Sequence, residues 1–168
     1  MHLRLATLED IPAITEIFNS VIAASNSVYR EEPVPHSERI EWFNEKQSHG
    51  FPIIVAEEGK EILGYGGYGT FRPAQGYRLT VEHTIHIAEA HRGRGLGKVI
   101  LTDLIERATT AGFHTMIGAI DSSNLASIAL HEKFCFTECA RIKEVAIKHG
   151  QMLDLVLMQK ILTIHDGD

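Results

Sequence analysis

The stretch TIHIAEAHRGRGLGKVILTDLI, residues 84–105, decides how the rest of the chain is interpreted. Its first part alternates in a strand-like way, and its last part repeats apolar residues at helical spacing. Between them lies Arg92-Gly93-Arg94-Gly95-Leu96-Gly97. Glycines let the backbone at a helix start curl around an anion, and arginines add charge-assisted contacts. The junction therefore predicts a phosphate or pyrophosphate site; a tight turn with solvated arginines is the alternative.

Two common nucleotide-binding loops do not fit this junction. A P-loop needs Ser or Thr after Gly-Lys to hold magnesium, but Val99 follows Lys98. A Rossmann fingerprint needs a glycine at its sixth place, and the sixth place counted from Gly93 is Lys98. The chain also lacks an early repeated strand–helix half. Both classes are excluded at specific positions.

Outward from the loop, hydrophobic periodicity predicts alternating strands and helices. Before the loop we expect a strand at 2–6, a helix from the N-cap Thr7 to about Ala24, a short helix capped by Ser37, a hairpin at 53–71 and a strand from about Leu79 to Ala88. After it we expect a helix to about Gly112, a strand at 115–120, a helix at 126–134 and a strand at 153–159. This order predicts one α/β (α+β) domain over 1–168, with a mixed, mostly antiparallel sheet flanked by helices, an ordered core over about 2–162 and a short C-terminal tail.

Net charge and the spacing of the histidines argue against two kinds of partner. The 16 Lys and Arg against 22 Asp and Glu give a net charge of −6, without a basic run. Nucleic acid is therefore not an expected partner, because backbone phosphates are bound by clustered cations. None of the ten histidines lies in a metal-ligand motif, so we expect no metal.

The cysteines and the first residues indicate the compartment. Cys135 and Cys139, three residues apart in FCFTEC, fit neither a redox motif nor half of a zinc site. We interpret them as small apolar fillers in a reducing compartment, with a labile disulfide as the alternative. MHLRLATLED lacks the apolar core of a signal peptide, and no run reaches transmembrane length. These features predict a cytoplasmic protein without a membrane partner.

Two motifs resemble one enzyme superfamily. Arg92, Gly95 and Gly97 match the Arg/Gln-x-x-Gly-x-Gly/Ala loop of the GNAT superfamily of acetyl-CoA-dependent N-acetyltransferases, and DSSNLASIALHEKFCF at 121–136 resembles its second signature. TVEHTIHI, LHEKFCF, IKHGQMLDLVLMQ and NSVIAASNSVYREEPVP look like the phosphinothricin and methionine sulfoximine/methionine sulfone branch. The resemblance covers almost the whole chain. It implies acetyl transfer from acetyl-CoA to the α-amino group of a glutamate- or methionine-like amino acid analogue, usually by a homodimer.

Two residues are candidates for the chemistry. Glu82 lies on a mostly apolar strand, where burial would raise the pKa of its carboxyl toward that of a useful base. The resemblance places a catalytic glutamate here; a structural ion pair or an exposed position is the alternative. His131 occupies the place where the superfamily usually has a tyrosine that protonates the leaving sulfur, and the phosphinothricin branch has histidine there. A helix histidine bonded to a backbone carbonyl is the alternative.

The cofactor site follows from the loop and from the resemblance. We expect the loop to hold the diphosphate of acetyl-CoA through Arg92, Gly93, Arg94, Gly95, Leu96, Gly97 and Lys98. The backbone of Ile85, His86 and Ile87 would bind the pantetheine arm as a strand does, although these residues also fit plain core alternation. Asn124 and Ser127 would contact the arm as well; helix capping is the alternative for both. Cys135 replaces the usual glycine of the second signature and is expected to strain a turn.

The loop before the Glu82 strand is the candidate substrate site. Arg72 can clamp a carboxylate or phosphinate, with Pro73 and Ala74 shaping the loop. Glu82, His83 and Thr84 would line the same site, and Tyr29 and Arg30 could wall it. A solvated Arg72 is the alternative. Two other functions stay open: acetylation of a different amine (a protein N-terminus, a polyamine or an aminoglycoside) and a non-catalytic acyl-CoA-binding module. Without a nucleophilic Ser or Cys beside a base, the enzyme would act by direct transfer in a ternary complex.

Overall fold

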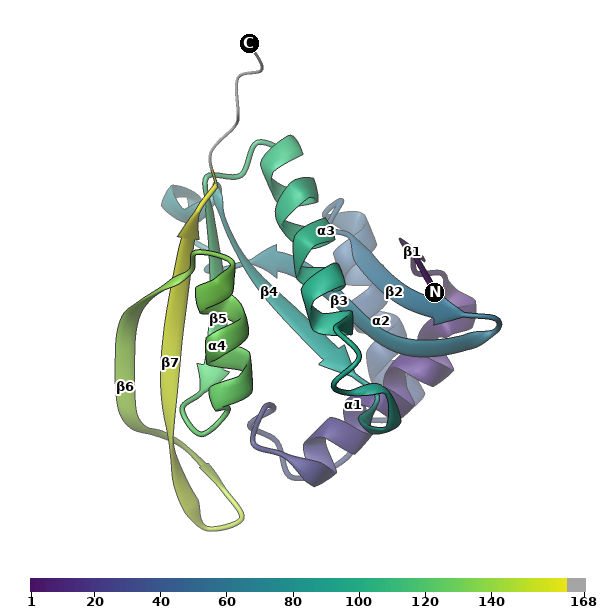
Figure 1. Cartoon of the computed structure of the whole chain (residues 1–168), viewed down its shortest axis with the longest axis horizontal. Helices are drawn as coiled ribbons and strands as arrows, with labels where there is room; N and C mark the ends of the chain where they lie inside the picture. The colour runs from purple at the N-terminus through teal and green to yellow at the C-terminus, as the bar shows by residue number, and fades with distance from the viewer. Residues whose placement is uncertain (163–168) are drawn as a thin grey trace.

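The computed structural model describes residues 1–162, and within them seven strands form one mixed sheet (Figure 1). The strand order is β1-β2-β3-β4-β5-β7-β6, and only β4 and β5 pair in parallel. The strands are β1 (His2–Leu5), β2 (Ile53–Glu58), β3 (Glu61–Thr70), β4 (Thr80–Ile87), β5 (Thr115–Asp121), β6 (Thr137–Lys148) and β7 (Gln151–Ile161). The predicted mixed, mostly antiparallel sheet is confirmed. The predicted C-terminal tail lies outside the described residues.

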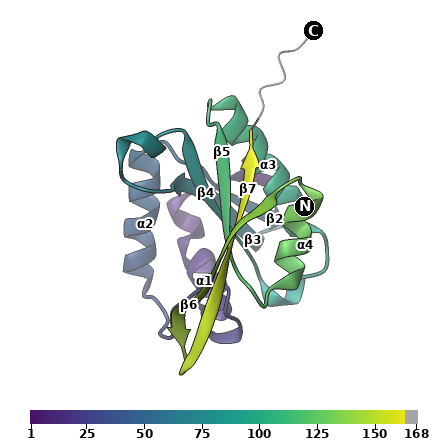
Figure 2. The same cartoon turned by 90° about the vertical axis from the view of Figure 1, so that its left-hand side faces the viewer.

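The helices cover the two faces of the sheet (Figure 2). They are α1 (Ile11–Ala24), α2 (His36–Ser48), α3 (Leu96–Thr110) and α4 (Leu125–Lys133), with 3-10 turns at Leu8–Asp10, Gln75–Tyr77 and Glu89–His91. The buried side chains of α1 and α2 pack in one apolar cluster and those of α3 in another. No helix within residues 1–162 is long and apolar enough to cross a membrane.

Neither of the first two helices begins as predicted. The N-cap predicted at Thr7 caps a 3-10 turn at Leu8–Asp10, and α1 itself begins at Ile11 after the N-cap Asp10. Thr7 forms a capping box with Asp10 at the 3-10 turn that leads into α1, because its backbone N–H donates to the Asp10 carboxylate over 2.8 Å. The predicted cap at Ser37 is wrong: α2 already begins at His36, after the extended residue Pro35. Pro35 has the fixed φ and extended ψ that precede a helix, and the helix is 13 residues long.

Strand β6 was not predicted from the sequence. It pairs antiparallel with β7 at the edge of the sheet, and its register shifts twice. Almost all of its side chains are exposed, so the strand lacks the alternation of buried and exposed residues that marks a half-buried strand. His149 and Gly150, both at positive φ, form the two-residue turn to β7.

The end of α4 holds a non-glycine residue in the left-handed region. Cys135 has φ 61°, and the N–H groups of Cys135 and Phe136 donate to the carbonyls of Glu132 and His131. This is a Schellman motif, whose left-handed position favours glycine, so the expected strain is present. The interpretation of Cys135 and Cys139 as small apolar fillers is wrong, since both are exposed, and both are free.

Candidate active site

A fork between β4 and β5 opens the site. The two strands pair only from Thr80–Thr115 to His83–Gly118, and beyond that point they diverge. β4 stays paired with β3 as far as Ile87, so one edge of β4 is open from Thr84 onward. Open main-chain N–H and C=O groups on such an edge can bind an extended ligand as an added strand does.

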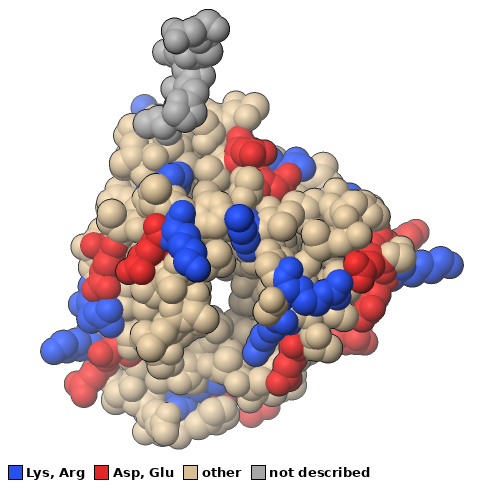
Figure 3. Space-filling view, in the orientation of Figure 1, with Lys and Arg blue, Asp and Glu red and all other residues tan. Residues whose placement is uncertain are grey.

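A channel of about 900 Å³ runs through this fork. Figure 3 shows an opening near the centre of the molecule with several Lys and Arg side chains at its rim. Residues from both faces of β4 line the channel: Thr84 and His86 on one side, and His83, Ile85 and Ile87 on the other. His86 packs against Phe18 of α1, whereas His83 stacks on His131 of α4. The channel therefore connects the two faces of the sheet.

The glycine loop forms an anion cradle at one end of the channel. Gly93 and Gly95 have φ 77° and 79°, and Gly95 is the N-cap of α3. The first residues of α3 line the channel, and their N–H groups lie at the positive end of the helix dipole. Gly97 lies against α4, where a Cβ would be 3.2 Å from Leu130. This geometry fits a diphosphate.

The charged residues of the loop divide into two groups. Arg92 and Lys98 line the channel, as do Gly93, Gly95, Leu96 and Gly97. Arg94 instead donates to Glu58 over 3.0 Å and contacts His91. Glu58 and His91 thus hold the Arg94 guanidinium, and the cofactor role predicted for Arg94 stays a prediction.

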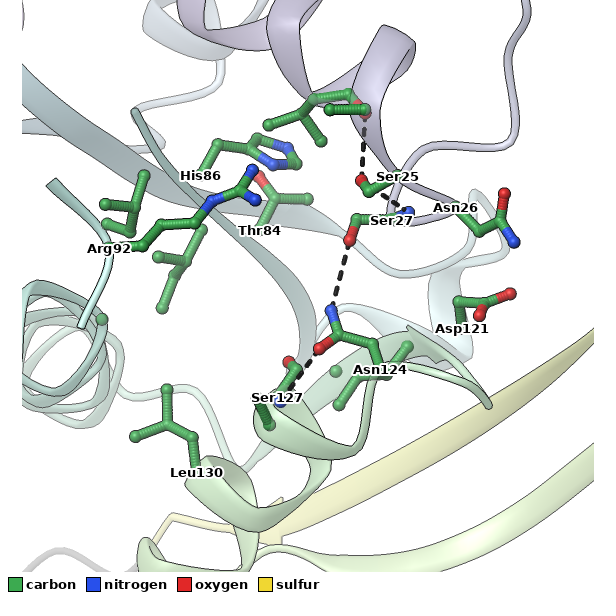
Figure 4. A pocket seen from close by; sticks show the side chains of 18 of the residues that line it. Ser25, Asn26, Ser27, Thr84, His86, Arg92, Asp121, Asn124, Ser127 and Leu130 are labelled. Atoms are coloured by element: carbon green, nitrogen blue, oxygen red, sulfur yellow. Dashed lines mark hydrogen bonds between the residues drawn. The ribbon is translucent and has the colours of Figure 1, made fainter. Parts of the chain in front are cut away.

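Asn124 joins the two walls of the channel (Figure 4). Its carbonyl oxygen accepts from the Ser127 N–H over 3.1 Å and caps α4, while its amide donates to the Ser27 hydroxyl over 3.2 Å. The capping alternative is therefore present, and Asn124 and Ser127 also line the channel. A pantetheine arm would pass beside this bridge.

Glu82 lies on the face of the sheet covered by α1 and α2. Its side chain is half-buried and makes no hydrogen bond or ion pair with any other residue in the described range 1–162. Burial raises the pKa of the Glu82 carboxyl above its ordinary value, and the nearby charges of Lys46 and Arg72 offset part of this rise. A carboxylate without a structural partner and with a raised pKa is suited to accept a proton.

His83 and His131 form a buried hydrogen-bonded pair on the opposite face. The Nδ1 atom of His131 lies 2.7 Å from the Ser127 carbonyl, and the Nε2 atoms of the two rings lie 3.1 Å apart. Because a carbonyl can only accept, His131 carries its proton on Nδ1, and His83 must donate from Nε2. Burial and the neighbouring His131 lower the pKa of His83 to about 3, so the pair is neutral at pH 7.

The hydrogen bonds of this pair limit the role predicted for His131 as the acid that protonates the leaving sulfur. Burial also lowers the pKa of His131 below its ordinary value. With its Nε2 accepting from His83, a neutral His131 has no proton to give at that atom, and donation requires the pair to gain one more proton. The Nδ1 atom of His83 is buried without a partner among residues 1–162. The structure brings His131 to the channel, but its role as the acid stays a prediction.

The substrate candidates are not all brought together. Arg72, Pro73 and Ala74 lie on an exposed loop before β4 and do not line the channel. The Tyr29 hydroxyl donates to Asp121 over 3.0 Å, and Arg30 pairs with Glu38. His83 and Thr84 do line the channel. Arg72 nevertheless lies close enough to lower the pKa of Glu82.

Some residues of the channel wall were not predicted from the sequence. Ser25–Ser27 line it from the end of α1, and the buried Lys148 holds them there by donating to the carbonyls of Ile22, Ser25 and Val28 over 2.7–3.0 Å. No local pattern marks Lys148. A signal existed for Gly118, because glycine inside an apolar strand indicates a close approach. A Cβ there would lie 3.0 Å from His131 and 3.2 Å from His83.

Known acetyltransferases are similar to this chain over most of its length. Residues 14–136 match the model of the acetyltransferase (GNAT) family. The L-methionine sulfoximine/L-methionine sulfone acetyltransferase of Salmonella typhimurium is 38% identical over 165 residues, which cover 98% of this chain and 96% of that protein. No group of three or more His, Cys, Asp or Glu side chains within residues 1–162 is arranged to hold a metal.

Solved structures of acetyltransferases are similar to this chain in both fold and sequence. A phosphinothricin acetyltransferase of Sinorhizobium meliloti in complex with acetyl-CoA has a TM-score of 0.93 at 34% identity, with 96% of this chain and 88% of that chain covered. A ribosomal-protein-alanine N-acetyltransferase of Brucella melitensis has a TM-score of 0.95 at 39% identity, with 96% of this chain and 100% of that chain covered.

Proposed function

This chain belongs to the acetyltransferase (GNAT) family and is an acetyl-CoA-dependent N-acetyltransferase, and from that premise we propose the identity of its acceptor. The acceptor is the α-amino group of a small amino acid analogue such as methionine sulfoximine, methionine sulfone or phosphinothricin. The observation that carries this proposal is the half-buried Glu82 carboxylate, which has no partner among the described residues and lies near the cations Lys46 and Arg72. The names of the similar proteins support it.

The residues around the channel have distinct roles in this proposal. Arg92, Lys98 and the N–H groups at the start of α3 hold the diphosphate, and the open edge of β4 at 84–87 holds the pantetheine arm. Acetyl-CoA supplies the acetyl group as an activated thioester. The cradle fits this cosubstrate because two left-handed glycines shape it.

Glu82 starts the chemistry by accepting one proton from the substrate ammonium. The freed nitrogen lone pair forms the C–N bond while the C–S bond of the thioester breaks. The nitrogen then releases its second proton to solvent to give the neutral amide, and the departing thiolate takes up a proton. The histidine pair at His83 and His131 is the proposed source of that proton after it has gained one from solvent. Transfer is direct, since both cysteines are exposed and do not line the channel.

Oligomeric state and location belong to the same proposal. We place the enzyme in the cytoplasm as one domain over 1–168 that forms a homodimer. The exposed apolar side chains of the edge strand β6, Ile142, Val145 and Ile147, support self-association.

One other acceptor has an observation in its favour. The Brucella melitensis structure is described as acting on ribosomal-protein alanine, which would make the acceptor a protein N-terminus. The cations beside Glu82 favour a free amino acid, whose carboxylate lies next to its amine, because a peptide N-terminus carries its carboxylate far from the amine.

The test is free thiol release from acetyl-CoA across a panel of amines. Methionine sulfone, phosphinothricin, an alanine-initiated peptide and spermidine are compared for the wild type and for Glu82→Gln. We expect methionine sulfone or phosphinothricin to react, and Glu82→Gln to lower kcat about 10²- to 10⁴-fold, as the loss of a general base does. The control is Glu16→Gln on the exposed side of α1, which should match the wild type.

Two results would contradict the proposal. Wild-type rates in Glu82→Gln would remove the base assignment. Reaction with the peptide or spermidine alone would replace the acceptor class.

A further inference from the structure

Lys46 lies beside Glu82 although the two are far apart in the sequence. It stands in the last turn of α2, and its Nζ atom occupies the space where a Cβ of Gly69 would be. Gly69 is the antiparallel partner of Glu82 in the β3–β4 ladder. Directly paired residues have Cβ atoms about 5 Å apart on the same face of a sheet, so the ammonium is a close neighbour of the Glu82 side chain.

The Lys46 ammonium has hydrogen-bonding capacity that the fold leaves free. It donates to the Tyr68 carbonyl over 3.2 Å, and its charge lies 5.6 Å from the Phe51 ring. No ion pair within 4.0 Å joins it to Glu82 or to any other carboxylate in the described part of the chain. An ammonium has three donors, so two remain for a ligand. Lys46 is half-buried, and burial lowers its pKa, which indicates a charge that an anion would stabilise.

Glu82 therefore lies near two cations, Lys46 from α2 and Arg72 from the loop before β4. A free amino acid carries an ammonium and a carboxylate on one carbon atom. A site for it needs an acceptor for the ammonium and, a few ångströms away, donors for the carboxylate. This group of side chains offers both kinds of partner.

We propose that Lys46 binds the α-carboxylate of the acceptor amino acid and so restricts the enzyme to free amino acids. The inference rests on the proposed function and names the residue that selects its substrate class. Gly69 is part of the same subsite, because any side chain there would displace the Lys46 ammonium.

The experiment compares two acceptors, L-methionine sulfone and its α-carboxamide, in which the α-carboxylate is replaced by an uncharged group of similar size, and each variant is compared with the wild type on the same acceptor. In Lys46→Met we expect kcat/KM for methionine sulfone to fall about 10- to 100-fold, mainly through KM, as the loss of one charge-assisted hydrogen bond does. For the carboxamide we expect a change of less than about threefold. Lys46→Arg keeps the charge and should recover part of the loss.

Two further variants separate binding from folding. Lys46→Gln keeps a donor for the Tyr68 carbonyl but removes the charge, so it should show the same loss for methionine sulfone even if Lys46→Met unfolds. Lys60→Met, in the exposed turn between β2 and β3, is the matched control and should leave both acceptors unchanged.

The outcomes can be told apart. Equal losses for the two acceptors in Lys46→Met and Lys46→Gln would mean that Lys46 only supports the fold, and would overturn this inference alone. A wild-type enzyme that acetylates neither methionine sulfone nor phosphinothricin would overturn the proposed function and this inference with it.

Discussion

The two faces of β4 place ionisable side chains in different electrostatic surroundings. On one face Glu82 is half-buried among Lys46 and Arg72, and on the other His83 is fully buried against His131. Burial favours the neutral form on both faces, so it raises the pKa of the glutamate and lowers that of the histidine. Only Glu82 has opposite charges nearby to restore its ionised form. Adjacent residues on one strand thus give a titrating carboxylate and a neutral, internally bonded histidine pair.

The largest expected effect is on the pH dependence of stability. His83 takes up a proton near pH 6.5 in the unfolded chain but only near pH 3 in the folded one, so its contribution to stability is complete above pH 6.5 and is lost as the pH falls toward 3. Glu82 has the opposite sign, because its raised pKa contributes stability at low pH that is lost as the pH rises through that pKa.

Urea titrations from pH 7 to pH 5 test this contrast. We expect His83→Gln to reduce the slope of unfolding free energy against pH by about 1.4 kcal/mol per pH unit below pH 6.5. The exposed His36→Gln is the control and should keep the wild-type slope. An unchanged slope in His83→Gln would show that the histidine face is not held neutral.

A smaller effect is expected where the fork meets the histidine pair. Gly118→Ala would place a methyl group 3.0 Å from His131 and 3.2 Å from His83. We expect a loss of about 1–3 kcal/mol in unfolding free energy from overpacking, together with reduced activity as the pair separates. Gly76→Ala is the matched control, since a Cβ there meets nothing within 4 Å. Equal stabilities of the two variants would mean that the pair can move without cost.

The smallest effect concerns the end of the helix that holds His131. Cys135→Gly should raise the unfolding free energy by about 1 kcal/mol, because it relieves a left-handed residue at φ 61°. Activity should not change, since Cys135 is exposed and does not line the channel. Thermal unfolding and thiol release measure both quantities. A destabilised variant would indicate that the cysteine side chain makes a contact of its own.

The sequence predicted the parts of the molecule that repeat a local pattern. The strand at 80–87, the glycine loop and α3 follow from alternation, from left-handed glycines and from helical spacing, and the cradle they form lines the channel as expected. Strand β6 could not be predicted in this way, because it is exposed on both sides and held by its pairing with β7. A strand defined by its partner leaves little trace in its own residues.

Only those site residues that stand out from their immediate neighbours in the chain could be predicted from the sequence. Glu82 and His131 stand out locally, yet their assignment to opposite faces requires the register of β4 and the position of α4. Lys46 reads as an ordinary polar residue of an amphipathic helix. Its place beside Glu82 depends on a glycine 23 residues later that leaves room for it.

Lys148 has a consequence for how the enzyme is made. Its ammonium holds the carbonyls at the end of α1, 120 to 126 residues earlier in the chain. At the pace of translation, about 5–20 residues per second, this lysine is synthesised roughly 6 to 25 s after the loop that it fixes. Until then the nascent protein lacks one fixed wall of the channel in which we propose that acetyl-CoA binds, and under that proposal capture of the cosubstrate awaits the synthesis of β6.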